Sequence, residues 1–174
     1  VSKESSTLMT FEKKILAEMP KCYALGMFEG EDTPSFLAAV EKDGPIRRFT
    51  LDGEPLETVA PGPGGVMTIT QVPGRKDQFL ATRKFFSPNF GGDDAAIASY
   101  TKQADGSWSE QILCDLPYVH RFGILKAADG QLWVLACSIK GGAETGVKDD
   151  WRTPGAVWAA PLSDNLEQYT ADSQ

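Results

Sequence analysis

The chain has 174 residues, 41% of them apolar, which suits a single domain with a buried core. Its formal net charge is −7 and its 17 Lys and Arg residues form no basic run, so the composition argues against nucleic acid as a partner. No stretch is long and apolar enough to span a membrane, so we expect no membrane partner either.

Along the chain, Gly and Pro residues separate short alternating runs that are rich in β-branched and aromatic residues, which predicts an all-β protein. The first run, residues 10–20, is similar to a later stretch, because Ile15 matches Ile112 and Pro20 matches Pro117. No inner strands precede this run. We therefore expect it to be an outermost strand that closes another blade of the same kind.

Three similar units of four runs follow, and they span residues 21–60, 61–117 and 118–170. Leu37, Leu80 and Leu135 occupy matching places in the second run of each unit. Four short strands, repeated at this spacing, predict the four-stranded antiparallel blades of a β-propeller.

Propellers typically close with four to eight blades, so three blades predict half of a six- or seven-bladed ring. The remaining blades would come either from the same, longer chain or from a second copy. Until they are in place, the outer flanks of the first and third units should be uncovered and prone to self-association.

The loops between strands differ on the two faces of such a disc. On one face they are short Gly-containing hairpins, whereas the other face carries a long connection with a Trp and paired carboxylates, a type that is more often functional. The candidate ligand-binding residues on this second face are Tyr23, Lys84, Asn89, Arg121, Lys140, Trp151 and Arg152.

His120, the single histidine, begins an innermost strand and is the candidate for proton transfer, with Asp149 or Asp150 as the assisting carboxylate. The alternatives are a histidine that only bonds neighbouring backbone, and an Asp–Arg pair that only closes its loop. Arg121 should point away from the side of the strand that His120 occupies, unless the strand start is bulged.

Metal and redox signals are weak. Asp93 and Asp94 could supply oxygen ligands to a divalent metal ion, but the sequence has no D-x-D-x-D-G loop, and turn residues of this kind are usually solvated. No cofactor is required by any motif. Three cysteines without a CxxC pair give no zinc signature and favour a reducing, cytoplasmic location.

The stretch "LPYVHRFGILKAADGQLWVLACSIK", followed by "DDWRTPGAVWAAPL", resembles the blades of VCBS/FG-GAP-like propellers, in particular those of aldos-2-ulose dehydratase-type sugar-processing proteins. The resemblance covers one unit of the chain. It implies a sugar-binding face with a metal-assisted dehydration or isomerisation of a keto-sugar, in which His120 would transfer a proton or bind the metal. A multi-histidine metal site would need residues beyond this chain.

Two functions follow from these observations. The first is the binding of a small carbohydrate-like ligand on the face of His120 and Trp151, with sugar lyase or isomerase activity. The second is a non-catalytic scaffold whose long loops hold a protein partner.

Overall fold

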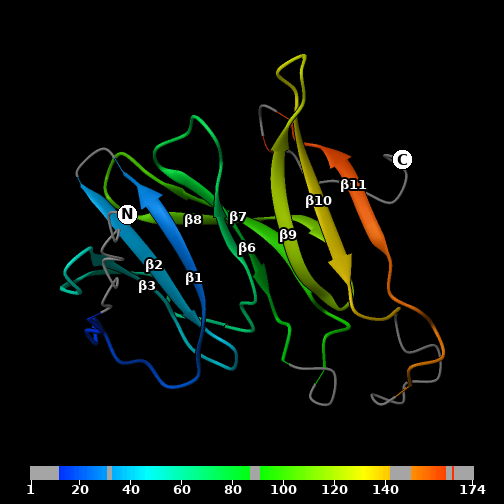
Figure 1. The fold of residues 1–174 in the computed structure, drawn as a ribbon, viewed down its shortest axis with the longest axis horizontal. Helices are drawn as coiled ribbons and strands as arrows, with labels where there is room; N and C mark the ends of the chain where they lie inside the picture. The colour runs from blue at the N-terminus through cyan, green and yellow to red at the C-terminus, as the bar shows by residue number, and fades with distance from the viewer. Residues whose placement is uncertain (1–11, 31–32, 87–90, 142–149, 164–165, 167–174) are drawn as a thin grey trace, which may run out of the picture.

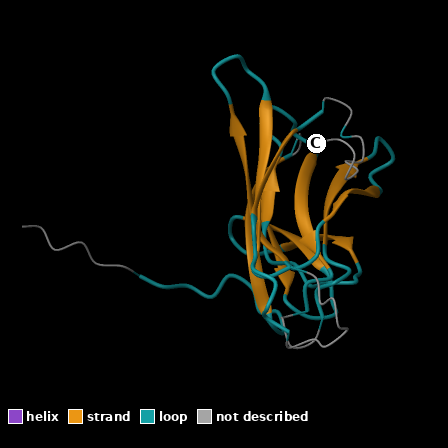
Figure 2. Cartoon of the chain, turned by 90° about the vertical axis from the view of Figure 1, so that its right-hand side faces the viewer, coloured by secondary structure: helices purple, strands orange, loops and turns teal. Residues whose placement is uncertain are grey.

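The computed structural model describes residues 12–30, 33–86, 91–141, 150–163 and 166, and within these ranges it contains strands and no helix (Figure 2). The all-β prediction is thus confirmed. The strands are β1 (Cys22–Glu29), β2 (Pro34–Val40), β3 (Ile46–Thr50), β4 (Pro55–Ala60), β5 (Ile69–Gln71), β6 (Gln78–Arg83), β7 (Ala96–Lys102), β8 (Trp108–Asp115), β9 (Val119–Lys126), β10 (Leu132–Ser138) and β11 (Val157–Pro161). In the described part of the chain, no helix meets the length and hydropathy needed to cross a membrane.

The strands form three antiparallel sheets, with orders β1-β2-β3-β4, β5-β6-β7-β8 and β9-β10-β11, which we call the first, second and third sheets. They follow one another across the molecule in chain order (Figure 1). None of the sheets closes on itself. The fourth strand expected at the end of the third sheet lies outside the described residues, apart from the buried Leu166.

The strand predicted over residues 10–20 is not formed in the part of it that the structure describes. Residues 12–19 pair with no strand, and residues 12–18 are exposed. The segment contacts the first sheet at two places: the Leu16 backbone lies against Gly53, and Met19 packs against Phe36 and Phe49. The strand predicted here would pair with the edge of another blade, and the described residues of one chain contain no such blade, so this pairing stays a prediction.

The sheets pack face to face, and two unlike faces meet at each contact. The Leu37 face of the first sheet packs on the Phe79 face of the second. The Leu80 face of the second sheet then packs on the Val134 face of the third. Because successive residues of a strand point to opposite faces, the second sheet is covered on both sides.

A partly buried carboxylate joins the first two sheets. Glu57 on β4 accepts hydrogen bonds from Arg48 on β3, from Lys102 on β7 and from Trp108 on β8, at 2.9–3.0 Å. Arg48 is itself buried and donates to Ser35 and to the carbonyl of Thr33. Burial alone would raise the pKa of Glu57, but the bonds from Trp108, Lys102 and Arg48 outweigh it and lower that pKa.

Replacing Glu57 should therefore weaken the fold in a pH-dependent way. At pH 7 we expect Glu57→Gln to lower the free energy of unfolding by about 1–3 kcal/mol, because hydrogen bonds to a charged group are lost. The folded-state pKa lies below the ordinary value of 4.5, so this contribution is present above pH 4.5 and is lost as the pH falls through the folded-state pKa. Urea unfolding at a series of pH values measures it.

The exposed Glu54 provides a matched control, since Glu54→Gln removes the same charge from the neighbouring turn. Its free energy of unfolding should stay within about 0.5 kcal/mol of the unchanged chain. An equal loss in both variants would show that Glu57 contributes only its charge to the whole molecule, and not its specific bonds.

Candidate functional site

The first strands of the first and third sheets, β1 and β9, begin in the same irregular way. In the first sheet, Cys22 pairs with Val40 and Ala24 with Ala39, so Tyr23 is an extra residue between them. In the third sheet, Val119 pairs with Ser138 and Arg121 with Cys137, which makes His120 the extra residue. A β-bulge of this kind redirects side chains and is common beside functional sites.

The residues just before the bulges also match. Lys21 and Tyr118 both adopt positive φ angles, 55° and 57°, a conformation that non-glycine residues seldom take. Local strain is therefore built into both strand starts. Tyr23 and His120 therefore hold equivalent positions in the first and third sheets.

Tyr23, His120 and Arg121 lie together although they come from the first and third sheets. The rings of Tyr23 and His120 meet edge-on, with 6.4 Å between centroids. The Arg121 guanidinium lies over the Tyr23 ring at 5.3 Å and donates a hydrogen bond of 3.2 Å to its hydroxyl. Arg121 also donates to the carbonyl of Met67, in the loop before β5.

His120 and Arg121 were expected to share one side of the strand only if the strand start is bulged. The bulge is present, and both side chains contact Tyr23. Tyr23 is 43% exposed and Arg121 is also exposed, so two of the three side chains are open to a ligand. We call these three residues the strand-start cluster.

His120 is half-buried against Phe85, whose ring lies edge-on at 5.1 Å between centroids. Its backbone carbonyl accepts a hydrogen bond from Thr68. Burial, and secondarily the positive charge of Arg121, lower the pKa of His120 below its ordinary value of 6.5. The imidazole is therefore neutral at pH 7, which leaves one ring nitrogen as an acceptor and the other as a donor.

Lys140 forms a second group with the long loop of the third sheet. Its ammonium lies 4.3 Å from the centroid of the Tyr118 ring and 5.2 Å from that of Trp151, and donates to the carbonyl of Asp150 at 3.1 Å. Lys140 is only 1% exposed, whereas Trp151 is 52% exposed. The buried Lys140 thus anchors the loop to the protein. The exposed ring of Trp151 is the part of this group that a ligand can contact.

The carboxylate of Asp150 is engaged within its own loop. It accepts bonds from the backbone and the guanidinium of Arg152, at 2.7–3.1 Å. This is the local Asp–Arg closure that the sequence left open as an alternative. The charge that lowers the pKa of His120 is that of Arg121, and the pairing of His120 with Asp150 in proton transfer stays a prediction.

The other candidate residues are placed as follows. Lys84 directly follows β6 and has a φ of 58°, and its backbone N–H donates to the carbonyl of Gly64. Asn89 and Asp149 lie outside the described residues. Asp93 accepts a hydrogen bond of 2.9 Å from Tyr118, and burial together with Asp93 raises the pKa of Tyr118 to about 12.

No group of three or more His, Cys, Asp or Glu side chains that could hold a metal ion occurs among the described residues. Cys22, Cys114 and Cys137 are free thiols. The geometry therefore offers hydrogen bonding and aromatic contact to a ligand, rather than metal coordination, over the part of the chain that the structure describes.

Sequence reasoning missed two residues of the site, Phe85 and Tyr118. Both are almost fully buried, and they lie on either side of Gly92, where an added Cβ would stand 2.9 Å from Tyr118 and 3.4 Å from Phe85. The Gly91-Gly92 pair in the sequence was the signal that two bulky side chains meet the backbone there.

Comparison with known proteins finds no protein-family model that matches this chain, and no curated protein of similar sequence.

The pKa of His120 should respond to Arg121. We expect Arg121→Gln to raise the pKa of His120 towards 6.5 without reaching it, because the charge is removed and the burial remains. The chain has one histidine, so an NMR titration of the imidazole C–H signals follows this group alone. In Arg152→Gln, which keeps Arg121, the pKa of His120 should not move.

Proposed function

We propose that the three sheets are consecutive blades of a β-propeller, and that a small carbohydrate-like ligand binds at the strand-start cluster. One observation carries the proposal: bulges at matching positions of the first and third sheets bring Tyr23, His120 and Arg121 together. In a propeller these strands would be the innermost ones, so the cluster would lie at the mouth of the central channel.

The chemistry of the cluster suits a polyol. The guanidinium of Arg121 donates hydrogen bonds in a fixed plane, and the neutral imidazole of His120 can both donate and accept. The exposed ring of Tyr23 offers a flat apolar surface to the C–H face of a sugar. A hydroxyl-bearing ring can satisfy these groups together, whereas a purely apolar ligand would leave them without partners.

The same groups could support proton transfer on a keto-sugar. A neutral imidazole can take a proton from the carbon beside a carbonyl, and the positive charge of Arg121 would stabilise the negative oxygen that develops. Return of the proton to the former carbonyl carbon, with transfer of the deprotonated carbon's hydroxyl proton to the former carbonyl oxygen, completes an isomerisation. Alternatively, a hydroxyl on the next carbon leaves with the proton held by the imidazolium, which releases water and completes a dehydration. The resemblance to sugar-processing propellers favours this class of reaction.

Trp151 is the second element of the proposed site. Its exposed ring is held by Lys140 on the same loop face, and stacking on a sugar ring is the role that its position fits best. Arg152, tied to Asp150, would line the edge of this loop. The free thiols are consistent with action in a reducing compartment, and we include a cytoplasmic location in the proposal.

A protein-interaction scaffold is the alternative function. The exposure of Trp151 favours it, because exposed tryptophans are enriched at protein interfaces. A partner of this kind would use the loop of Trp151 and would not need the imidazole of His120.

Ligand binding can be measured through the His120 signals and through saturation-transfer NMR on a panel of aldoses, ketoses and uronic acids. We expect at least one sugar to shift the His120 signals, and Arg121→Ala to weaken that sugar's binding about tenfold or more, because a charged hydrogen bond is lost. Isomerised or dehydrated product in the same samples would establish catalysis.

Arg75→Ala is the matched control, because Arg75 lies in the β5–β6 turn at the far end of the strands from His120. It should bind the sugar as the unchanged chain does. If no sugar in the panel moves the His120 signals, or if Arg75→Ala weakens binding as much as Arg121→Ala, the proposed site is wrong.

A further inference from the structure

The two outer faces of the stack are apolar, and they are not alike. The third sheet turns its Leu135 face outward, and the first sheet turns its Phe36 face outward. Inside the stack, a Leu face always meets the opposite kind of face, as Leu37 does with Phe79. The two outer faces of the described stack are therefore complementary to each other, like the two sides of one interface.

The open face of the third sheet matches a buried face residue by residue. Val157, which is 78% exposed, corresponds through the strand registers to Ile46 of the first sheet, which is 2% exposed. Leu125, 55% exposed, corresponds to Phe28, which is fully buried between the first and second sheets. The open face thus has the character of an interface whose partner is not in the stack.

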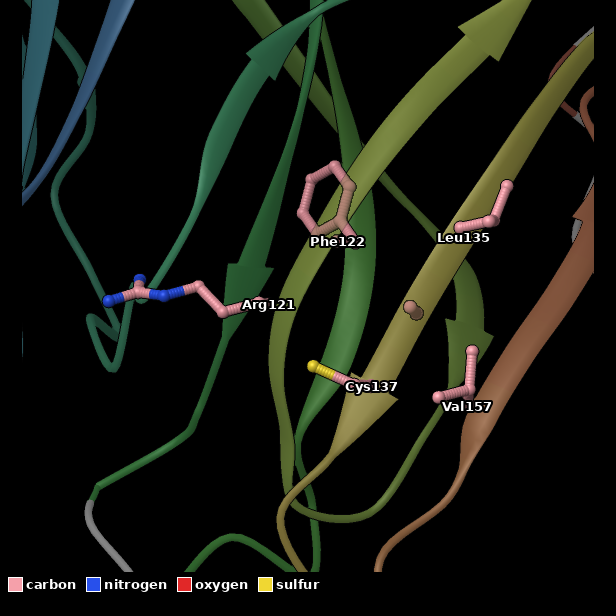
Figure 3. Close-up of a pocket in the computed structure, with 6 residues that line it drawn as sticks. Arg121, Phe122, Leu135, Cys137 and Val157 are labelled. Carbon is pink, nitrogen blue, oxygen red and sulfur yellow. The ribbon is translucent and has the colours of Figure 1, made fainter.

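A hollow marks the centre of this face. It has a volume of about 220 Å³, and Figure 3 shows Leu135, Cys137 and Val157 around it, with Arg121 at its edge. Its lining is almost wholly apolar, as expected for a surface that another sheet covers.

Two glycines show what the hollow receives. Gly26 and Gly123 hold equivalent positions on β1 and β9, three residues after the bulged Tyr23 and His120. A Cβ on Gly26 would lie 2.7 Å from the side chain of Ile69, so this glycine admits the neighbouring sheet. A Cβ on Gly123 would meet nothing within 4 Å. Gly123 therefore leaves an equivalent space on the third sheet, which no described residue fills.

The first sheet carries the side chains that fit this space. Leu25, 68% exposed, and Met27, 60% exposed, stand on its outer face at the positions that Phe122 and Ile124 hold in the packed face of the third sheet. The stacked pair Phe36 and Phe49 lies beside them, with 5.2 Å between ring centroids, and is buried with Met19 of the segment before β1 packed against it. Phe79 and Tyr100 form the equivalent stacked pair in the second sheet, at 5.0 Å, and there the first sheet covers it.

We propose that a second copy of this chain docks the outer face of its first sheet on the open Leu135 face of the third sheet, with Leu25 of one copy seated over Gly123 of the other. Two such contacts, head to tail, would join two copies into a ring of six sheets, within the four to eight that propellers contain. A second copy is the occupant that the structure supports, because this chain itself presents both halves of the contact.

The test is the molar mass in solution, measured by light scattering across a range of protein concentrations. We expect the unchanged chain to have twice the mass of one chain. Leu25→Asp and Gly123→Val should each have the mass of one chain, because one places a charge in the contact and the other fills the space above Gly123. Circular dichroism should be unchanged in both, since Leu25 is exposed and a Cβ at Gly123 meets no atom of the described residues within 4 Å.

A mixture of the two variants distinguishes this contact from one between identical faces. The unaltered third sheet of Leu25→Asp can still dock on the unaltered first sheet of Gly123→Val, so pairs of chains should return on mixing. Ala104→Asp is the control: it adds the same charge at an exposed turn of the second sheet and should keep the doubled mass.

The proposal is overturned if the unchanged chain has the mass of one chain, if Gly123→Val or Leu25→Asp keeps the doubled mass, or if their mixture forms no pairs. The readout does not involve a sugar. Its failure would leave the proposed ligand site standing, and the reverse also holds.

Discussion

An antiparallel sheet with apolar residues on both sides has to be covered on both sides, and this constraint shapes the whole molecule. The second sheet satisfies it, because the Phe79 face lies under the first sheet and the Leu80 face lies under the third. On the outer face of the first sheet, Phe36 and Phe49 are buried with Met19 against them, but Leu25 and Met27 remain exposed. Among the described residues, the Leu135 face of the third sheet is uncovered, with Val157 and Leu125 exposed. The hydrogen bonds around Glu57 orient the first sheet on the second, since they join particular strands of these two sheets.

Much of the fold could be predicted from the sequence, because the alternation of apolar residues specifies a strand locally and its repetition specifies equivalent strands. The run at residues 119–126 coincides with β9, and Leu37, Leu80 and Leu135 do occupy matching positions. The arrangement of the sheets as a ring could not be established in this way. Whether residues 10–20 pair as a strand depends on a neighbouring edge, which no local pattern encodes.

The candidate site was predicted in part. The sequence placed Tyr23, His120 and Arg121 on one face of the predicted disc, and it predicted that Arg121 would share a side of the strand with His120 only if the strand start were bulged. What the sequence could not provide were the hydrogen-bond registers that make Tyr23 and His120 extra residues, or the contact of His120 with Phe85, which lies in the loop after β6. Such contacts depend on how sheets far apart in the chain pack. The sequence therefore indicated the right strand ends and left the pairing of their side chains open.

The bulges have a consequence for how such a site can change over evolutionary time. An ordinary strand residue is bound to one face, so inserting or deleting a residue exchanges the two faces of everything that follows. Tyr23 and His120 have no paired residue on the neighbouring strand. The alternation of side chains between the two faces of the sheet continues from Ala24 and from Arg121. Side chains at these positions can be gained, lost or replaced while the strands keep their pairing register. The residues of such a site can therefore evolve independently of the residues that pack the sheets.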